Sequence, residues 1–584
     1  MARLVDTRRL TGRNFLLPVP GAAAEVAFDA AQDTNEGDAA RCDALEAAIR
    51  ARVATVVASV EASVGAPLGI DASTMVFRRH HGGLSMAIAA PVDALLTAAD
   101  MLEVAVGDVV GTEVDPLVRD GLPATAAKER CPQVLALVVE AARRGVPTVV
   151  DEEGLSIGLG CRGQTWVLTG LPAIDDVPWA SLGRIPVAMV TGTNGKTTTT
   201  RLLAAVLTAS GGVVGATSTD GVVIGGVVVD EGDWSGPGGA RRVVRDDRVE
   251  LAVLETARGG LLRRGLAFEG YDVGVITNIA ADHLGEYGVT DLGAMARVKC
   301  LVGHGVRAGG AVVLNADDPW LMEQAPLMTA AVVLVGRSRS ATIDAHLASG
   351  GATAWWVEDS DGVATIVRGQ GTAPAVAVVA VVDVPITFGG AAAYNVDNAV
   401  AAAAAAAAMG IDDDTIRQGL MAFQPSAAQS AGRSNVLVHE GITVVVDFAH
   451  NPAAIEALWG LVRHLRTSST GKLIVCVGAP GDRLDHELHA FADAIAVANP
   501  DAVICRDLPD YLRGRLPGEV PALLSHRLVE RGRDAAQVSV AVDDLDGLER
   551  ALALAASGDV VVLTPLVDAA GVFGRLRTAG FAVD

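Results

Sequence analysis

The segment from Thr191 to Thr200, TGTNGKTTTT, combines residue types that bind phosphate groups. It follows an apolar run at 185–190 that predicts a buried strand, and it precedes a helical pattern of apolar residues. Backbone N–H groups in a glycine-rich turn at a helix N-terminus form an anion site. Lys196 can add positive charge at the outer phosphates, and Thr197 can offer its hydroxyl to Mg²⁺. Because the strict pattern has a glycine where this chain has Val190, the segment predicts a variant phosphate loop.

Other polar residues follow strand-like runs, where α/β sheets bind their ligands. Glu255 ends the run VLET, and Asn278 ends VGVITN with Asp282 and His283 close behind. Lys299 lies sixteen positions after His283. Asn315 ends the run VVLN, and Asp317 and Asp318 follow it closely. Each alone is typical of a helix cap, but together with a phosphate loop they supply hard oxygen ligands for Mg²⁺ and polar groups for a nucleotide.

The composition limits the possible classes of protein. A chain of 584 residues predicts about three or four domains. Half of the residues are apolar and only 4% are aromatic, which favours layered α/β packing. The net charge of −23 argues against nucleic-acid binding. The six cysteines form no CxxC pair, the N-terminal segment has no apolar signal core, and the alanine run 401–408 is too short to cross a bilayer. We therefore expect a cytoplasmic protein that binds neither membranes nor nucleic acid.

Strand-like and helical runs alternate from about residue 185 onward, which predicts a parallel sheet with helices on both faces. Residues 340–390 are rich in Val, Thr and Gly and predict an antiparallel edge, and a second alternating block begins after 428. The stretch 171–186, rich in Pro, Asp and small residues, predicts a linker. A GxGxxG pattern at 158–163 precedes a strand-like run instead of a helix, so it does not predict a dinucleotide site.

Several of these segments resemble the Mur ligase superfamily. They are TGTNGKTTTT, Glu255, TNIAADHLG, Lys299, NVDNA at 395–399 and DFAHNP at 447–452. More narrowly, the chain resembles the Mur-ligase half of cyanophycin synthetase, whose signatures resemble TSTDGVVIGG, EGDWSGPGGARRVVRD, ETARGGLLRRGL, PGDRLD and LRGRLPGEV. The resemblance covers about 185–584, and the opening RRLTGRNF and LSIGLGCRGQTWVLT resemble that enzyme's N-terminal domain more weakly.

The resemblance implies an α/β multidomain fold: an N-terminal α+β domain at 1–183, a central P-loop ATPase domain with a mostly parallel sheet at 184–428, and a C-terminal Rossmann-like domain at 429–584. It implies an ATP-dependent amide ligase that joins an amino acid, such as arginine or lysine, to a carboxylate, such as an aspartate side chain, through an acyl phosphate. ADP and phosphate would be released. Cyanophycin synthetase has an ATP-grasp domain between its N-terminal and Mur regions, for which this chain has no room. We therefore expect no extension of an aspartate backbone, and we expect a homo-oligomer.

The resemblance also implies roles for individual residues. Lys196, Lys299 and His283 would be catalytic, and Lys299 occupies the place of a carbamylated lysine, although an ordinary ion-pairing lysine fits as well. Mg²⁺ would be held by Thr197, Glu255 and His283. The nucleotide contacts would be Gly192, Thr193, Asn194, Gly195, Lys196, Thr197, Thr198, Asn278, Asn398, Arg433 and Asp447. The substrate contacts would be His450, Asn451 and Arg258. The alternatives are a different P-loop phosphotransferase, or a binding or scaffold protein with a degenerate site.

Overall fold

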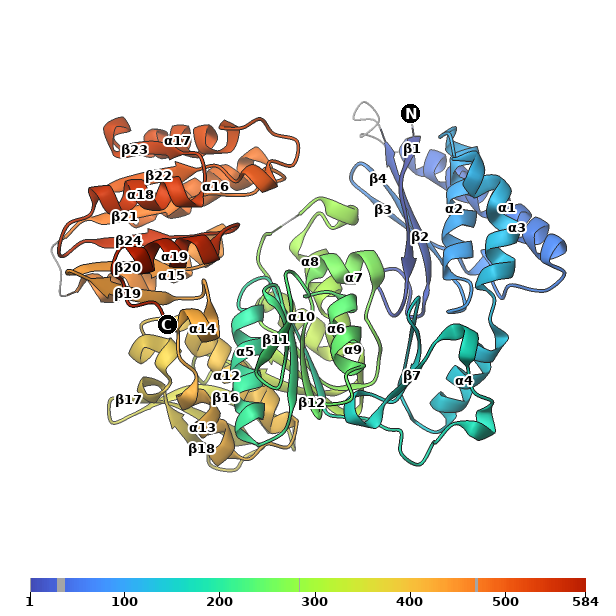
Figure 1. Ribbon diagram of the computed structural model, residues 1–584, viewed down its shortest axis with the longest axis horizontal. Coiled ribbons are helices and arrows are strands. Elements are labelled where there is room, and N and C mark those ends of the chain that lie inside the picture. Colours follow the sequence, from blue (N-terminus) through green and yellow to red (C-terminus); the bar gives the residue numbers. More distant parts are fainter. Residues whose placement is uncertain (1, 29–36, 283, 468–470) are drawn as a thin grey trace. The chain divides into compact units, whose positions relative to one another are not determined.

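A computed structural model describes residues 2–28, 37–282, 284–467 and 471–584, coloured along the chain in Figure 1. The chain divides into two units. The first contains Met1–Ile279, Leu284–Leu334 and Ala404–Ile411, and the second contains Ala280–His283, Val335–Ala403 and Asp412–Asp584. The domain boundaries expected at 183/184 and 428/429 stay predictions. In the part of the chain that the structure describes, no helix is both long enough and apolar enough to cross a bilayer.

The first unit begins with a four-stranded antiparallel sheet in the order β1-β2-β4-β3. Its strands are β1 (Ala2–Leu10), β2 (Gly21–Phe28), β3 (Val76–His80) and β4 (Gly83–Ala89). Apolar residues of β2 and β4 on one face pack against the helices α1 (Gly37–Val64), α2 (Leu95–Val110) and α3 (Pro116–Glu129). Alternate residues of the strands point to the other face, which carries charged side chains of β1 and β2.

A small module follows, made of α4 (Pro132–Arg143) and the antiparallel strands β5 (Thr148–Asp151), β6 (Gly154–Ile157) and β7 (Gln164–Trp166). β7 follows the GxGxxG pattern, so the expectation of a strand there is confirmed. The predicted linker 171–186 is packed against this module, since Val177 and Leu182 are buried with Leu155 and Ile157. The many small and acidic residues of this segment predicted a linker, but two of its apolar residues pack in a core.

The central sheet of the first unit is mostly parallel, with the strand order β11-β10-β9-β12-β8-β13-β14-β15. The strands are β8 (Val187–Thr191), β9 (Val214–Ser218), β10 (Gly221–Ile224), β11 (Val227–Glu231), β12 (Leu251–Glu255), β13 (Tyr271–Ile276), β14 (Val306–Asn315) and β15 (Ala331–Val335). The helices are α5 (Lys196–Ala209), α6 (Pro237–Val244), α7 (Arg258–Arg264), α8 (Leu292–Lys299), α9 (Leu301–His304) and α10 (Pro319–Gln324). β8 lies between β12 and β13 and runs parallel to both, which confirms the predicted parallel sheet.

The second unit contains the expected antiparallel strands at 340–390, which are β16 (Thr353–Ser360), β17 (Val363–Gln370) and β18 (Val376–Ala380). Nearby helices are α11 (Ala341–Ala348), α12 (Ala393–Ala408), α13 (Asp413–Ala422) and α14 (Ala427–Ser430). The alanine-rich sequence of α12 favours a helix, as predicted.

The second unit ends in a six-stranded sheet with the order β19-β20-β24-β21-β22-β23, drawn in orange and red in Figure 1. The strands from β20 to β23 in this order are parallel, while β19 is antiparallel to β20. The strands are β19 (Asn435–His439), β20 (Ile442–Val446), β21 (Leu473–Val477), β22 (Ala502–Arg506), β23 (Val538–Ala541) and β24 (Val560–Leu563). One face packs on α15 (Pro452–Arg466), α16 (Asp485–Val497) and α17 (Glu519–Glu530), and the other on α18 (Asp544–Leu554) and α19 (Ala569–Thr578). This layering confirms the predicted Rossmann-like fold.

A buried ion pair ties this sheet together at the carboxyl end of β22. Arg506 is 1% exposed, and its guanidinium donates to the Asp544 carboxylate and to the Thr564 carbonyl. Asp544 also accepts from the backbone N–H groups of Val567 and Asp568 at 3.1 and 2.9 Å. The pair therefore connects β22 with the start of α18 and the segment after β24.

We predict that Arg506→Leu lowers the free energy of unfolding by about 3–5 kcal/mol, because it leaves the Asp544 carboxylate buried without its cation. Urea denaturation followed by circular dichroism measures the change. The matched control is Arg550→Leu, which removes a half-exposed arginine paired with Asp546, and we expect it to cost about 1 kcal/mol or less. Equal losses for the two variants would contradict the prediction.

Candidate active site

The phosphate loop connects β8 to α5 and contains two glycines with positive φ. Gly192 has φ 151° and Gly195, at the N-cap of α5, has φ 82°. A Cβ atom at Gly192 would lie 1.9 Å from the Thr277 hydroxyl oxygen, so only glycine fits beside β13. The loop is therefore pressed directly against the end of the neighbouring strand.

Polar groups at the end of β13 hold this loop in place. Asn278 accepts from the Asn194 N–H at 2.9 Å and donates to the Asn194 carbonyl at 3.0 Å. The Thr277 hydroxyl donates to the same carbonyl at 2.6 Å, and the Asn278 carbonyl accepts from the Thr193 N–H at 2.8 Å. The structure thus brings Asn278 to the predicted loop, where it contacts backbone groups.

Two lysines also contact the loop. Lys196 Nζ donates to the Thr193 carbonyl at 2.9 Å, and Lys299 Nζ donates to the Gly192 carbonyl at 2.8 Å. Lys299 is 4% exposed, at the last position of α8. Its ammonium in this position stabilises the loop backbone, and its carbamylation stays a prediction.

Thr197 and Glu255, which are predicted to bind Mg²⁺, are in direct contact. The Thr197 hydroxyl donates to Glu255 Oε2 at 2.9 Å, and the two residues are 5% and 1% exposed. The register explains the contact, because Glu255 lies opposite Val190 at the carboxyl ends of β12 and β8. A hydroxyl and a carboxylate are the hard oxygen donors that Mg²⁺ prefers, so these residues fit the metal. Thr198, the next residue, is also buried. His283, the other expected ligand, lies outside the described residues.

Arg258 and Asp318 have structural contacts in the first unit. Arg258, at the start of α7, is 8% exposed and forms an ion pair with Glu286. Asp318 caps α10 and accepts from the Ile279 N–H at 2.6 Å. Burial raises the pKa of Asp318, while its backbone hydrogen bonds oppose the shift. Asp318 therefore supports the end of β13 and acts as a helix cap.

A second group of predicted residues comes together in the second unit. The Asn398 amide donates to Asn395, and Asn395 donates to the Ser434 hydroxyl at 3.1 Å. The Ser434 N–H donates to Asp447 at 2.8 Å. Burial raises the pKa of Asp447, and the nearby Arg433 guanidinium opposes this shift. Asn398, Arg433 and Asp447 thus belong to one polar network.

His450 and Asn451 follow β20 in the same unit. The His450 Nδ1 atom lies 2.8 Å from the Phe448 carbonyl, so Nδ1 carries a proton and Nε2 faces Asp282 at 3.9 Å. Asn451 caps α15 by accepting from the Ala454 N–H at 2.9 Å. Asp282 also pairs with Arg483 at 2.6 Å, and the Arg483 side chain is 6% exposed. Arg483 belongs to the PGDRLD segment, but no site role was expected for it because the segment contains no recognisable chemical pattern of its own.

We predict that Gly192→Ala abolishes ATP binding by the loop, because its Cβ would collide with Thr277. Isothermal titration with ATP and Mg²⁺ measures the loss. Gly211→Ala is the control, since Gly211 also has positive φ, 90°, but has open space around it. Binding that is equally weak in both variants would show that positive φ, and not the close approach to Thr277, is responsible.

Known proteins are similar to this chain along the segments that contain the predicted site residues of both units. The profile of the Mur ligase middle domain matches residues 190–406, and that of the Mur ligase, glutamate ligase domain matches residues 432–566. The cyanophycin synthetase of Crocosphaera subtropica is 39% identical over 396 residues, which cover 68% of this chain and 44% of the relative. The chain thus spans less than half the length of that relative.

A UDP-N-acetylmuramoyl-L-alanyl-D-glutamate--2,6-diaminopimelate ligase of Xanthomonas oryzae pv. oryzae is 30% identical over 398 residues, covering 66% of this chain and 73% of the relative. The solved structure of E. coli FolC in complex with DHPP and ADP has 21% identity and a TM-score of 0.49, covering 68% of this chain and 89% of FolC. The sequence similarity confirms the resemblance seen in the motifs. The chain belongs to the Mur ligase family, a family of ATP-dependent ligases that form C–N bonds.

Proposed function

We propose that this chain joins an amino acid to a carboxylate-bearing acceptor, with ATP as the third substrate and Mg²⁺ as the metal cofactor. The observation that carries the proposal is the buried Thr197–Glu255 pair beside a phosphate loop held by Lys299 and Asn278. A scaffold protein with a degenerate site would have no reason to keep a buried carboxylate, a hydroxyl and two lysines around one loop.

In this proposal the N–H groups of Gly195 to Thr198 and the Lys196 ammonium bind the β- and γ-phosphates. The N–H groups of Thr193 and Asn194 instead donate to Asn278 and so shape the loop. Thr197, Glu255 and His283 would hold Mg²⁺, which would neutralise charge on the phosphates when bound. Lys196 turns from the Thr193 carbonyl toward the transferred phosphoryl group. Asn398 contacts the adenine region, and Arg433 and Asp447 reach the nucleotide, with Asp447 near the ribose.

The reaction has two steps. A carboxylate oxygen of the acceptor attacks the γ-phosphorus of ATP and ADP leaves, which gives an acyl phosphate. The amine of the amino acid then attacks the carbonyl carbon, loses a proton and displaces phosphate. We propose that Arg258, His450 and Asn451 contact the two substrates, and that water is excluded from the acyl phosphate during the second step. Arginine and lysine are the first amines to test, with an aspartate side chain as the acceptor.

The test is phosphate release from ATP with pairs of candidate acids and amines, followed by product masses. We expect release only when both substrates are present, with one amino acid added per available carboxylate. Release without an acceptor would indicate a different P-loop enzyme, and no release with any pair would favour a scaffold. A ladder of aspartate-plus-arginine units would contradict the expectation that the aspartate backbone is not extended.

We predict that Lys196→Ala lowers this rate about 10²–10³-fold, because it removes a charged contact to the transferred group in a water-poor site. Stopped assays of phosphate release measure the rate, and circular dichroism checks the fold. Arg201→Ala is the control, since Arg201 lies in the same helix and pairs with the exposed carboxylate of Asp220. A Lys196→Ala variant with more than about a tenth of the wild-type rate would count against the assignment.

We predict that Glu255→Gln raises the Mg²⁺ concentration for half-maximal activity at least about tenfold. Glutamine can still accept the Thr197 hydrogen bond, but its amide is a much poorer ligand for a hard cation. Mg²⁺ titrations at saturating ATP measure the shift. Glu250→Gln, just before the same strand, is the control, and superimposable curves for Glu255→Gln and wild type would rule out the metal role.

A further inference from the structure

Residues 11–13, just after β1, contact the C-terminal end of α7, the helix that follows β12. The Thr11 N–H donates to the Arg264 carbonyl, and the Leu266 N–H donates to the Arg13 carbonyl, both at 2.8 Å. A Cβ atom at Gly12 would lie 2.4 Å from the Leu266 carbonyl oxygen. Glycine therefore allows the two backbones to touch. The RRLTGRNF segment is thus held against the segment that ends α7.

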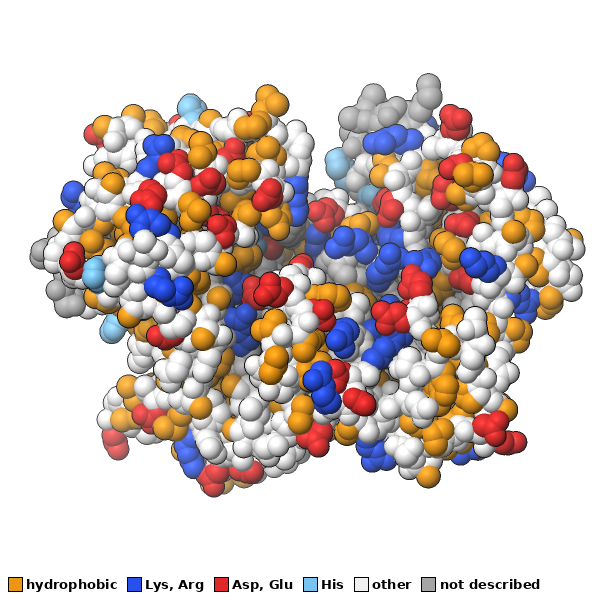
Figure 2. Space-filling model, in the orientation of Figure 1, with side chains coloured by type: hydrophobic (Ala, Val, Ile, Leu, Met, Phe, Trp, Pro, Cys, Tyr) orange, Lys and Arg blue, Asp and Glu red, His pale blue; other side chains and the backbone are white. Residues whose placement is uncertain are grey.

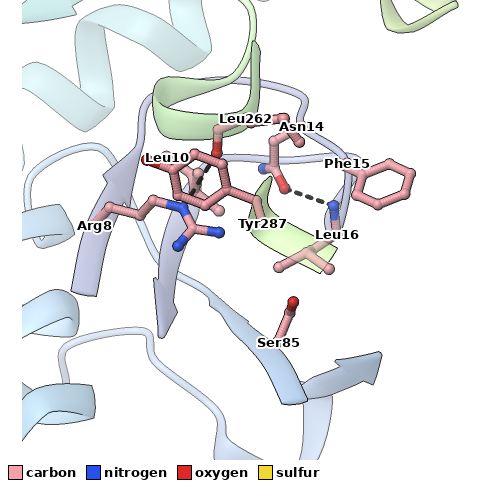
Figure 3. A pocket seen from close by; sticks show the side chains of 8 residues that line it. All are labelled: Arg8, Leu10, Asn14, Phe15, Leu16, Ser85, Leu262 and Tyr287. Atoms are coloured by element: carbon pink, nitrogen blue, oxygen red, sulfur yellow. Dashed lines mark hydrogen bonds between the residues drawn. The ribbon is translucent and has the colours of Figure 1, made fainter. Parts of the chain in front are cut away.

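The Arg8 side chain extends from β1 toward α7 and Tyr287 (Figure 3). Its Nε donates to the Leu262 carbonyl of α7 at 3.2 Å, and its guanidinium carbon lies 4.6 Å from the centroid of the Tyr287 ring. Arg8 is 8% exposed, and its Nη1 donates to Asp6 at 3.0 Å. A desolvated guanidinium over an aromatic ring is attracted to it more strongly than an exposed one. Arg8 thus contacts α7 and the Tyr287 segment at once.

Both contacted segments follow strands that carry site residues. α7 begins three residues after Glu255, the last residue of β12. Tyr287 lies in the 3₁₀ turn Glu286–Gly288, nine residues after Asn278. The Arg258–Glu286 ion pair links the two segments directly. A shift of either segment would therefore displace groups beside the phosphate loop.

The Tyr287 backbone needs such support. Tyr287 has φ 50° and ψ 34°, a left-handed conformation that bulky residues rarely adopt. The residue after it, Gly288, packs on the His80 ring, which a Cβ atom there would approach to 2.4 Å. A conformation of this kind persists only where the surrounding structure holds it. In the N-terminal sheet, Arg8 on β1 contacts the Tyr287 ring, and His80 and Arg78 on β3 lie against Gly288.

We propose that Arg8 is a positioning residue: it holds the Leu284–Val289 segment through the Tyr287 ring and α7 through Leu262, and so fixes the segments that follow β12 and β13. The N-terminal sheet then positions segments of the ligase site. Its effect on turnover rests on the proposed function, whereas its effect on the Leu284–Val289 segment does not.

The experiment compares Arg8→Met, Arg8→Lys, Tyr287→Phe and Tyr287→Gly in the full chain. Arg3→Met is the control, because Arg3 lies on the same strand and is exposed. Hydrogen exchange of the backbone N–H groups at 284–289 reports the segment, and kcat and KM for ATP report the site. Thermal unfolding of each variant reports overall stability.

We predict that Arg8→Met speeds exchange at 284–289 about tenfold and lowers kcat by a similar factor, with little change in KM for ATP. Arg8→Lys should have smaller effects on the exchange rate and on kcat, because lysine retains the charge but not the planar contact with the ring. Tyr287→Phe should resemble wild type, since it keeps the ring. Tyr287→Gly should resemble Arg8→Met without a lower melting temperature, because glycine accepts the positive φ.

Unchanged exchange in Arg8→Met and Tyr287→Gly would overturn the proposal, and so would faster exchange with an unchanged kcat. A loss of kcat in Tyr287→Gly that is matched by a lower melting temperature would assign the residue to stability alone. If Arg8→Met does not fold, Arg8→Lys and Tyr287→Gly decide the question. If the wild-type protein releases no phosphate with any substrate, the proposed function fails, and the exchange data still decide whether Arg8 holds the segment.

Discussion

The close approach of the phosphate loop to the end of β13 constrains the rest of the site. Gly192 leaves no room for a side chain beside Thr277, so the loop backbone lies against the neighbouring strand. This approach brings the loop carbonyls within reach of Thr277, Asn278 and Lys299, which hold them by hydrogen bonds. The parallel register of β8 and β12 then places Glu255 beside Thr197. One steric condition and one register thus bring together residues that are more than a hundred positions apart.

Much of this could be read from the sequence, because local patterns carry it. The glycine-rich loop between a strand and a helix, the polar residues at strand ends and the alternation of strands and helices all predicted features that the structure confirms. Glu255 and Thr197 could be paired in advance, since the carboxyl ends of parallel strands meet at one edge. The Ala-rich helix α12 and the antiparallel strands β16–β18 were equally predictable from composition.

Other features depend on contacts that no local pattern contains. Val177 and Leu182 lie in a stretch rich in linker residues, and only the packing against β6 shows that they are buried. Asn278 and Asn451 were expected to contact the nucleotide and the substrate, and these roles stay predictions. Their hydrogen bonds to the backbone of the loop and of α15 could not be foreseen from spacing alone. Arg8 was one arginine among several in the opening segment, and two of its partners, Leu262 and Tyr287, lie more than 250 positions later. Such distant pairing is invisible to arguments from spacing.

That separation has a consequence for how the protein is made. The four strands of the N-terminal sheet are complete at Ala89, but the Leu262 carbonyl that Arg8 binds is 254 residues away from it in the chain. At the usual speed of synthesis, roughly 5 to 20 residues per second, Arg8 waits on the order of 10 to 50 s for this partner. During that interval this face of the sheet is exposed to water on the ribosome. Its arginine, glutamate and histidine side chains tolerate this exposure better than apolar side chains would. The charged residues on this face therefore limit the apolar surface that the first domain exposes during translation, and the apolar residues there, Leu10, Ala23 and Ala87, pack with Leu17 of the same domain.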